Sequence, residues 1–240
     1  MEITPSLHRI GNDIVAAYLV VTDEGITIID AGMAGHWADL QAELATLGRP
    51  LSDIRGLVLT HGDSDHIGFA ERLRRDHGVP VYVHEADAAR ARGETKTSPS
   101  FGPMKIGATA GFFWYSMRKG GLRTTHLTEV TAVRDGQVLD LPGAPRIIGL
   151  PGHSPGSIAI HVPVADAIFM GDAMTTRHVL TGKRGPQLMP RAFAADGLQS
   201  LASLKALERL DAPLTLFGHG EPWTEGLSKA VEHARERGLT

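Results

Sequence analysis

The chain has 240 residues, a formal net charge of −3 and no cysteine. The length allows one large domain, and the missing cysteine excludes disulfides, thiolate metal ligands and a cysteine nucleophile. The acidic balance argues against nucleic-acid binding, no stretch has the roughly 20 apolar residues of a membrane helix, and the N-terminus lacks the features of a secretory signal. We therefore expect a cytoplasmic protein with neither a nucleic-acid nor a membrane partner.

The first part of the sequence alternates short apolar strands with amphipathic helices. Strands over 14–22 and 26–30 form a predicted hairpin, because Asp-Glu-Gly separates them. Apolar residues at helical spacing predict a helix over 37–47 that ends at Gly48. Further predicted elements are strands at 55–60 and 79–84 and helices at 67–75 and 85–92.

The segment 95–125 is the least regular part of the sequence. It is rich in glycine, proline, serine and threonine, but it contains the run Phe112-Phe113-Trp114-Tyr115. Because glycines and prolines flank this apolar run, we favour an insertion that forms a lid or a homodimer surface. The alternative is a helix whose aromatic side chains pack on the core.

Strands resume after this segment and two helices follow. The predicted strands are 131–134, 137–141, 146–150, 157–162, 167–170 and 213–217, and the predicted helices are 196–210 and 225–237. Two strand-rich blocks, each closed by helices, suit two sheets packed face to face with helices outside. The alternation of strands and helices alone would equally permit a doubly wound sheet.

The segment Thr60 to His66 (THGDSDH) carries four potential metal ligands directly after a predicted buried strand. These are His61, Asp63, Asp65 and His66. Two imidazoles and two carboxylates at the end of an apolar strand are costly to desolvate unless they are paired or coordinated. The segment is therefore a candidate metal-binding loop, in which the hydroxyl of Ser64 supports its neighbours.

Three later segments repeat the same form, with a histidine or aspartate next to glycine after an apolar run. They present His153 in PGHSPGS, Asp172 in GDAM and His219 in FGHGE. Each alone is more often a structural residue or a turn aspartate than a ligand. Together with the first loop they give four histidines and three aspartates, a nitrogen and oxygen donor set suited to zinc, iron or manganese. Seven other histidines show no such pattern, and we interpret them as ordinary surface or core residues: His8, His36, His77, His84, His126, His161 and His233.

These motifs, in this order, resemble the signature of the metallo-β-lactamase superfamily, as does the IIDAG run at 28–32. The resemblance implies an α+β fold, a four-layer αββα sandwich, as a single domain over 1–240. It also implies a site for two metal ions, zinc being the first expectation. Transferred residue by residue, His61, the residue at 63 and His153 bind the first ion. Asp65, His66 and His219 bind the second ion, and Asp172 bridges the two.

The sequence departs from the family pattern His-x-His-x-Asp-His, because Asp63 replaces the second histidine. Two divalent ions bring a charge of +4, and the three aspartates bring −3 where the usual site has −2. The extra charge should make a bound water less acidic and disfavour anionic substrates, while the oxygen donor favours iron or manganese. Three interpretations of the site remain open. It is a carboxylate-rich site for two ions, a site that binds one ion tightly and one weakly, or a degenerate site.

The resemblance implies hydrolysis by a metal-bound hydroxide, with Asp65 binding one ion and orienting the hydroxide. The substrate class left after exclusion is a small-molecule ester, lactone or thioester. In the segment 175–191, His178, Lys183 and Arg184 are candidates for binding a substrate carboxylate, the alternative being a solvated loop.

The sequence also allows two alternatives to a hydrolase. A diiron redox enzyme of the same fold also carries a carboxylate at position 63, but such proteins add a flavin-binding domain for which this sequence offers no room. A non-catalytic ligand-binding member is the second alternative, and the retention of all seven donor side chains argues against it.

Overall fold

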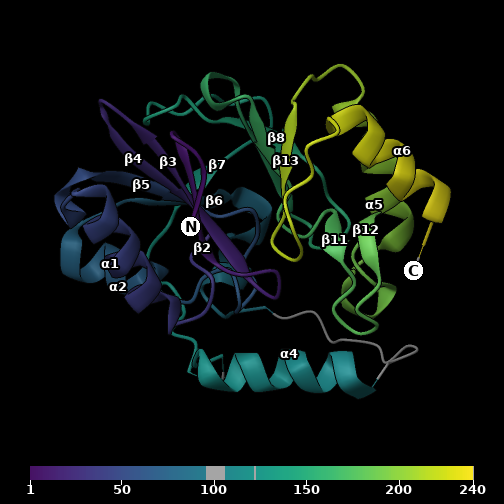
Figure 1. Cartoon of the computed structure of the whole chain (residues 1–240), viewed down its shortest axis with the longest axis horizontal. Helices are drawn as coiled ribbons and strands as arrows, with labels where there is room; N and C mark the ends of the chain where they lie inside the picture. The colour runs from purple at the N-terminus through teal and green to yellow at the C-terminus, as the bar shows by residue number, and fades with distance from the viewer. Residues whose placement is uncertain (96–105, 122, 240) are drawn as a thin grey trace.

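The computed structural model describes residues 1–95, 106–121 and 123–239 of the chain. Two β-sheets pack face to face, and helices cover their outer sides (Figure 1). The chain therefore has the αββα sandwich that the sequence predicted.

The larger sheet comes from the N-terminal part of the chain. Its strands are β1 (Glu2–Thr4), β2 (Leu7–Gly11), β3 (Ala16–Thr22), β4 (Gly25–Ile29), β5 (Ile54–Val58), β6 (Val81–His84) and β7 (Thr131–Val133). They lie in chain order across the sheet. Pairing is antiparallel from β1 to β4 and parallel from β4 to β7. Because β5 lies centrally, its C-terminal end opens at the middle of one sheet edge.

The smaller sheet has the strand order β13-β10-β9-β8. Its strands are β8 (Arg146–Gly149), β9 (Ile158–Val162), β10 (Ala167–Phe169) and β13 (Leu214–Leu216). A separate hairpin joins β11 (Thr175–Arg177) to β12 (Arg184–Gln187). Strands β10 and β13 are parallel, so the residues that follow them meet at one edge.

Six α-helices and five 3₁₀ helices complete the described part of the chain. The α-helices are α1 (His36–Leu47), α2 (Ala70–His77), α3 (Ala88–Ala91), α4 (Ile106–Arg118), α5 (Gly197–Ser203) and α6 (Leu227–Arg237). The 3₁₀ helices are η1 (Leu51–Asp53), η2 (Glu85–Asp87), η3 (Pro163–Ala165), η4 (Arg191–Phe193) and η5 (Leu204–Leu207). No helix in these described ranges is long and apolar enough to cross a bilayer.

Three hydrophobic cores stack through the molecule and account for its layers. In β4, Ile28 packs in the core beneath α1 and α2, whereas Ile29 packs in the core between the two sheets. Leu57 and Val58 of β5 divide in the same way. Alternate side chains of a strand point to opposite faces, so a strand buried on both faces appears as a continuous apolar run. The third core lies between the smaller sheet and α6.

Several predicted boundaries were wrong. Strands β1 and β2 were missed, because β2 buries the polar side chains of His8 and Arg9 against distant partners, Glu43 at 2.7 Å and Glu221 at 2.6 Å. The predicted strand at 137–141 forms only an isolated bridge at Val138. The predicted helix at 196–210 is an α-helix followed by η5, and the helix predicted at 67–75 begins at Ala70.

Helix α4 occupies part of the segment 95–125, of which residues 96–105 and 122 lie outside the described ranges. It runs along the lower side of the molecule beneath both halves (Figure 1). The Tyr115 hydroxyl forms a hydrogen bond of 2.7 Å with Nε2 of His36, and the Thr109 hydroxyl donates to the carbonyl of Leu180 at 3.2 Å. Helix α4 thus contacts both halves of the sandwich.

Candidate metal centre

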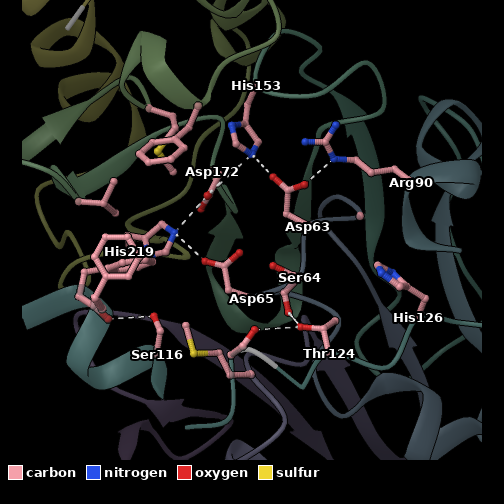
Figure 2. A pocket seen from close by; sticks show the side chains of 18 of the residues that line it. Asp63, Ser64, Asp65, Arg90, Ser116, Thr124, His126, His153, Asp172 and His219 are labelled. Carbon is pink, nitrogen blue, oxygen red and sulfur yellow. Dashed lines mark hydrogen bonds and ion pairs between the residues drawn. The ribbon is translucent and has the colours of Figure 1, made fainter. Parts of the chain in front are cut away.

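The seven predicted ligands meet at one edge of the sandwich, where loops from both sheets converge. Figure 2 shows Asp63, Asp65, His153, Asp172 and His219 around the cavity. The loop after β5 supplies His61, Asp63, Asp65 and His66, and the loops after β8, β10 and β13 supply His153, Asp172 and His219. Each loop follows a buried strand. The fold therefore brings together donors that are as far apart in the sequence as residues 61 and 219.

The first cluster consists of His61, Asp63 and His153, whose donor atoms all lie within 4.8 Å of one another. Oδ2 of Asp63 lies 3.1 Å from Nε2 of His153 and 3.6 Å from Nε2 of His61. This is the set that the resemblance assigned to the first ion. Asp63 thus faces the other two donors, as a ligand at this position must.

The second cluster consists of Asp65, His66 and His219, and Asp172 stands between the two clusters. Oδ2 of Asp172 lies 3.1 Å from Nε2 of His219 and 3.9 Å from Nε2 of His61, and Oδ1 lies 3.4 Å from Nε2 of His66. Nε2 of His219 is also 3.5 Å from Oδ2 of Asp65. Asp172 therefore has the central position of a bridging carboxylate.

Several donor atoms are buried without a hydrogen bond among the described residues. They are Nε2 of His61, Nε2 of His66 and Oδ1 of Asp172. A buried polar atom without a partner costs about 1–3 kcal/mol, so a native protein normally supplies one. Nitrogen and oxygen donors that face each other across such a space suit divalent cations. The residues therefore fit two metal ions.

Neighbouring groups orient three of the four histidine rings. Nδ1 of His66 donates to Oδ2 of Asp30 at 2.8 Å, and Nδ1 of His219 donates to the carbonyl of Ile14. The Thr60 hydroxyl donates to Oδ2 of Asp30 at 2.8 Å and can accept from Nδ1 of His61 at 3.0 Å. With Nδ1 protonated, each ring presents its Nε2 lone pair to the cluster, as metal-binding histidines do.

Two buried aspartates that sequence reasoning did not assign to the site hold its loops together. Asp30 follows β4 with a left-handed φ of 61° and also accepts from the backbone N–H of Thr60 at 2.8 Å. Asp87 is fully buried and accepts from the backbone N–H groups of Gly62 at 2.9 Å and Gly156 at 2.8 Å, and from the Ser154 hydroxyl at 2.7 Å. Asp87 therefore ties the loop of His61 to the loop of His153. The hydroxyl of Ser154 adds to this connection through Asp87.

The charges of the cluster shift the pKa values of its members. Burial raises the pKa of Asp63, but the hydrogen bond from His153 and the nearby positive groups hold it well below its usual range. Burial also raises the pKa of Asp172, but the charges of His219 and His66 outweigh this effect and keep it low. The pKa of His66 is raised, because Asp172 and Asp30 outweigh its burial. A divalent cation can replace the protons on the histidines, so metal uptake should weaken in acid.

A cavity of about 590 Å³ opens over the two clusters. Asp63, Asp65 and His219 contribute to its polar floor, and α4 forms part of its wall through Phe112 and Met117. The Phe112 ring centroid lies 6.2 Å from that of His219. The aromatic run of the segment 95–125 thus contributes to the cavity over the candidate metal centre.

The three predicted substrate-binding residues do not line this cavity. They lie on or next to the β11–β12 hairpin. His178 is buried, and its Nδ1 accepts from the backbone N–H groups of Leu180 and Thr181 in a turn. Lys183 is exposed, and Arg184 forms an ion pair with Asp13 at 2.6 Å.

Sequence reasoning did not assign two ionisable residues of the cavity wall to the site. Arg90 of α3 lines the cavity and places Nε 2.5 Å from Oδ1 of Asp63 (Figure 2). His126, which the sequence pattern presents as an ordinary histidine, also lines the cavity, with Nδ1 buried and without a hydrogen bond among the described residues. Neither residue lies in a motif, so no local signal marks it.

Comparison with known proteins agrees with this geometry. Residues 10–219 match the family model of the metallo-beta-lactamase superfamily. The probable metallo-hydrolase YflN of Bacillus subtilis is 26% identical over 232 residues, which cover 93% of this chain and 87% of that protein. The hydroxyacylglutathione hydrolase GloC of Haemophilus influenzae is 27% identical over 179 residues, 74% of each chain.

Solved structures show the same fold. The protein TTHA1623 in a di-iron-bound form is 27% identical with a TM-score of 0.65, and the match covers 94% of this chain and 96% of that one. A metallo-beta-lactamase family protein of Thermus thermophilus reaches a TM-score of 0.69 at 22% identity over 98% of this chain and 79% of that one. The relatives named as hydrolases and the metal-ligand clusters together indicate a metal-binding hydrolase.

Proposed function

The chain belongs to the metallo-β-lactamase superfamily, and from this premise we propose that it hydrolyses a small-molecule ester, lactone or thioester at a dinuclear metal site. One observation carries the proposal. Six inward-facing donor side chains surround a seventh, that of Asp172, at the floor of a cavity large enough for a small molecule. Bound divalent ions would supply Lewis-acid activation of water and of the substrate carbonyl.

Asp65 is the residue to which we assign the proton-handling role. Both Asp65 and Asp172 line the cavity, but the side chain of Asp65 is 21% exposed and that of Asp172 only 4%, so Asp65 is the more open of the two. One oxygen of Asp65 faces His219 at 3.5 Å, and the carboxylate projects into the open part of the site (Figure 2). A carboxylate in this position can orient a water molecule and accept its proton.

The cavity wall favours an uncharged, partly apolar substrate. Phe112, Met189 and Phe193 line one side. Among the described lining residues, Arg90 provides the one guanidinium or ammonium group, and it is engaged with Asp63. An acyl chain or a lactone ring fits such a wall better than a substrate carboxylate does.

We propose α4 as a cover for this site. The homodimer contact and the cytoplasmic location remain predictions.

Metal content and activity test this function together. Protein purified without added metal would be analysed by elemental mass spectrometry and assayed on lactones, esters and S-acylglutathiones. We expect two equivalents of metal, and we expect Asp65→Asn to lower kcat by about 10²- to 10⁴-fold, the range for loss of a general acid or base. The exposed Asp140 supplies a matched control, since Asp140→Asn should leave kcat unchanged. Absence of metal uptake, or full activity of Asp65→Asn, would contradict the proposal.

A diiron redox enzyme is the second candidate. The carboxylate at position 63 and the di-iron-bound form of TTHA1623 favour it. It predicts iron as the main metal and oxygen consumption in the presence of a chemical reductant. Zinc as the main metal, with no oxygen consumption, would exclude it.

A further inference from the structure

Arg90 and Asp63 form a partly buried ion pair at the edge of the candidate metal centre. Arg90 is 9% exposed, and its Nε lies 2.5 Å from Oδ1 of Asp63. The other oxygen of Asp63 faces the cluster, 3.1 Å from Nε2 of His153 and 3.6 Å from Nε2 of His61. The two carboxylate oxygens therefore have separate partners, a guanidinium on one side and the metal-ligand cluster on the other.

The backbone holds Arg90 in this place. A side chain at Gly62 would put its Cβ 2.7 Å from the backbone nitrogen of Ala91 and 3.0 Å from Cβ of Arg90, so only glycine allows this approach. Asp87, three residues before Arg90, accepts from the backbone N–H of Gly62 at 2.9 Å. The segment that carries Arg90 is thus tied to the loop that carries Asp63.

The pair also changes the charge balance of the site. Asp63, Asp65 and Asp172 carry −3 in total, and Arg90 adds +1, which leaves −2. A site with a neutral histidine at position 63 would carry the same −2 from Asp65 and Asp172. The sequence predicted a more negative site because that charge count did not include Arg90, which lies far from Asp63 in the chain.

We propose that Asp63 and Arg90 act as one charge-compensated metal ligand, in which Arg90 is a positioning residue. Arg90 holds Oδ1, so that only Oδ2 faces the first metal position. The pair thereby replaces the neutral imidazole that the family pattern places there. This inference rests on the metal centre of the proposed function, but it requires no particular substrate.

The two members of the pair should depend on each other. With Asp63 present, Arg90→Met removes the group that orients the carboxylate, and loss of such a partner typically weakens metal binding by about 10- to 100-fold. With Asp63→His, no carboxylate needs orienting, and the guanidinium places an uncompensated positive charge beside the cations. In that background Arg90→Met should raise the metal affinity of the first site.

The test is a double-mutant cycle on metal affinity, measured without substrate. Zn²⁺ would be titrated into the unaltered protein, Arg90→Met, Asp63→His and the double variant, in competition with a chromogenic chelator. The second site, which contains Asp65, His66 and His219, serves as an internal control for folding and should keep its affinity in all four proteins. Arg92→Met is the matched control, because Arg92 pairs with Glu94 at the surface and should not affect either site.

The outcomes separate this inference from the proposed function. A loss of first-site affinity on Arg90→Met that reverses in the Asp63→His background supports the pair. An equal effect in both backgrounds, or tighter binding on Arg90→Met with Asp63 present, would overturn the role of Arg90 and leave the hydrolase proposal intact. Absence of Zn²⁺ uptake by the unaltered protein would overturn both. Normal coupling with no hydrolysis would contradict the proposed function alone.

Discussion

Asp87→Asn should loosen the connection between two metal-binding loops. The carboxylate of Asp87 accepts three hydrogen bonds: from the backbone of Gly62 and the hydroxyl of Ser154 on Oδ2, and from the backbone of Gly156 on Oδ1. An asparagine can keep its oxygen toward Gly62 and Ser154, but its amide group then faces the N–H of Gly156. Two donors would meet in a buried space, and one N–H would have no acceptor.

The expected magnitude follows from these three bonds. Hydrogen bonds to a charged group contribute about 1.5–3 kcal/mol each, and a buried donor without a partner costs about 1–3 kcal/mol. Asp87→Asn weakens two bonds and breaks the third, so we expect a loss of about 2–4 kcal/mol in the free energy of unfolding. Such a loss is large beside the roughly 5–15 kcal/mol that holds a typical domain folded. Unfolding in urea, followed by circular dichroism, measures it.

Metal binding distinguishes a connecting role from general stability. Asp87 joins the loop of His61 and Asp63 to the loop of His153, and these three residues form the first cluster. In folded Asp87→Asn, the Zn²⁺ affinity of this first site should fall by about 10- to 100-fold, with a smaller change at the second site. Asp140→Asn, at an exposed carboxylate, is the control. An unfolding free energy within about 0.5 kcal/mol of the unaltered protein, with unchanged Zn²⁺ affinity, would refute this reasoning.

Three further predictions concern metal removal, the glycine at 218 and the buried His36. Removal of metal by a chelator should lower the Tm, and Zn²⁺ should restore it, because a ligand that binds only the folded state stabilises that state; equal Tm values would contradict a folded-state metal site. Gly218→Ala should abolish stoichiometric metal binding, because its Cβ would lie 2.5 Å from Oδ1 of Asp172 and 2.5 Å from Cε1 of His66, whereas Gly107→Ala, in open space, should not change metal content. Burial, assisted by Lys119, lowers the pKa of His36 to about 4, so the unfolded chain binds more protons between pH 6.5 and 4 and stability is lost as pH falls through that range. The difference is worth about 3 kcal/mol at about 1.36 kcal/mol per pH unit. His36→Asn should show a correspondingly flatter stability curve in urea titrations at several pH values, and an equal slope would contradict the assignment.

The convergence of the candidate ligands could be predicted from the sequence because each of them lies in a local motif. His153, Asp172 and His219 each follow an apolar run and a glycine, and a buried strand that ends in a polar side chain delivers that side chain to a sheet edge. The order of the strands was not needed. Knowing only that strand ends converge was enough to group residues that lie far apart in the chain.

The supporting residues could not be predicted in the same way. Asp87 and Arg90 lie on a short helical segment with ordinary composition, and their roles depend on which loop packs against that segment. The same reason explains why the candidate substrate residues do not line the cavity. Lys183 and Arg184 are close in sequence to Asp172, but the β11–β12 hairpin directs them toward the outer surface and Asp13. A residue that is close in sequence to a candidate ligand therefore need not line the same cavity.

The ion pair between Asp63 and Arg90 bears on which metal the site selects. When only the predicted ligands are considered, the carboxylate of Asp63 adds both a negative charge and an oxygen donor to the site. Both favour iron or manganese over zinc. In the fold, Arg90 cancels the charge and leaves only the donor type. The two effects are thereby separated, since total charge now matches that of a site with histidine at this position. If total charge governs selection, zinc should predominate in the purified protein, and Asp63→His should not change that preference. If the oxygen donor governs selection, iron or manganese should predominate, and Asp63→His should shift the preference toward zinc. Because four imidazole nitrogens remain among the seven donors, we expect zinc.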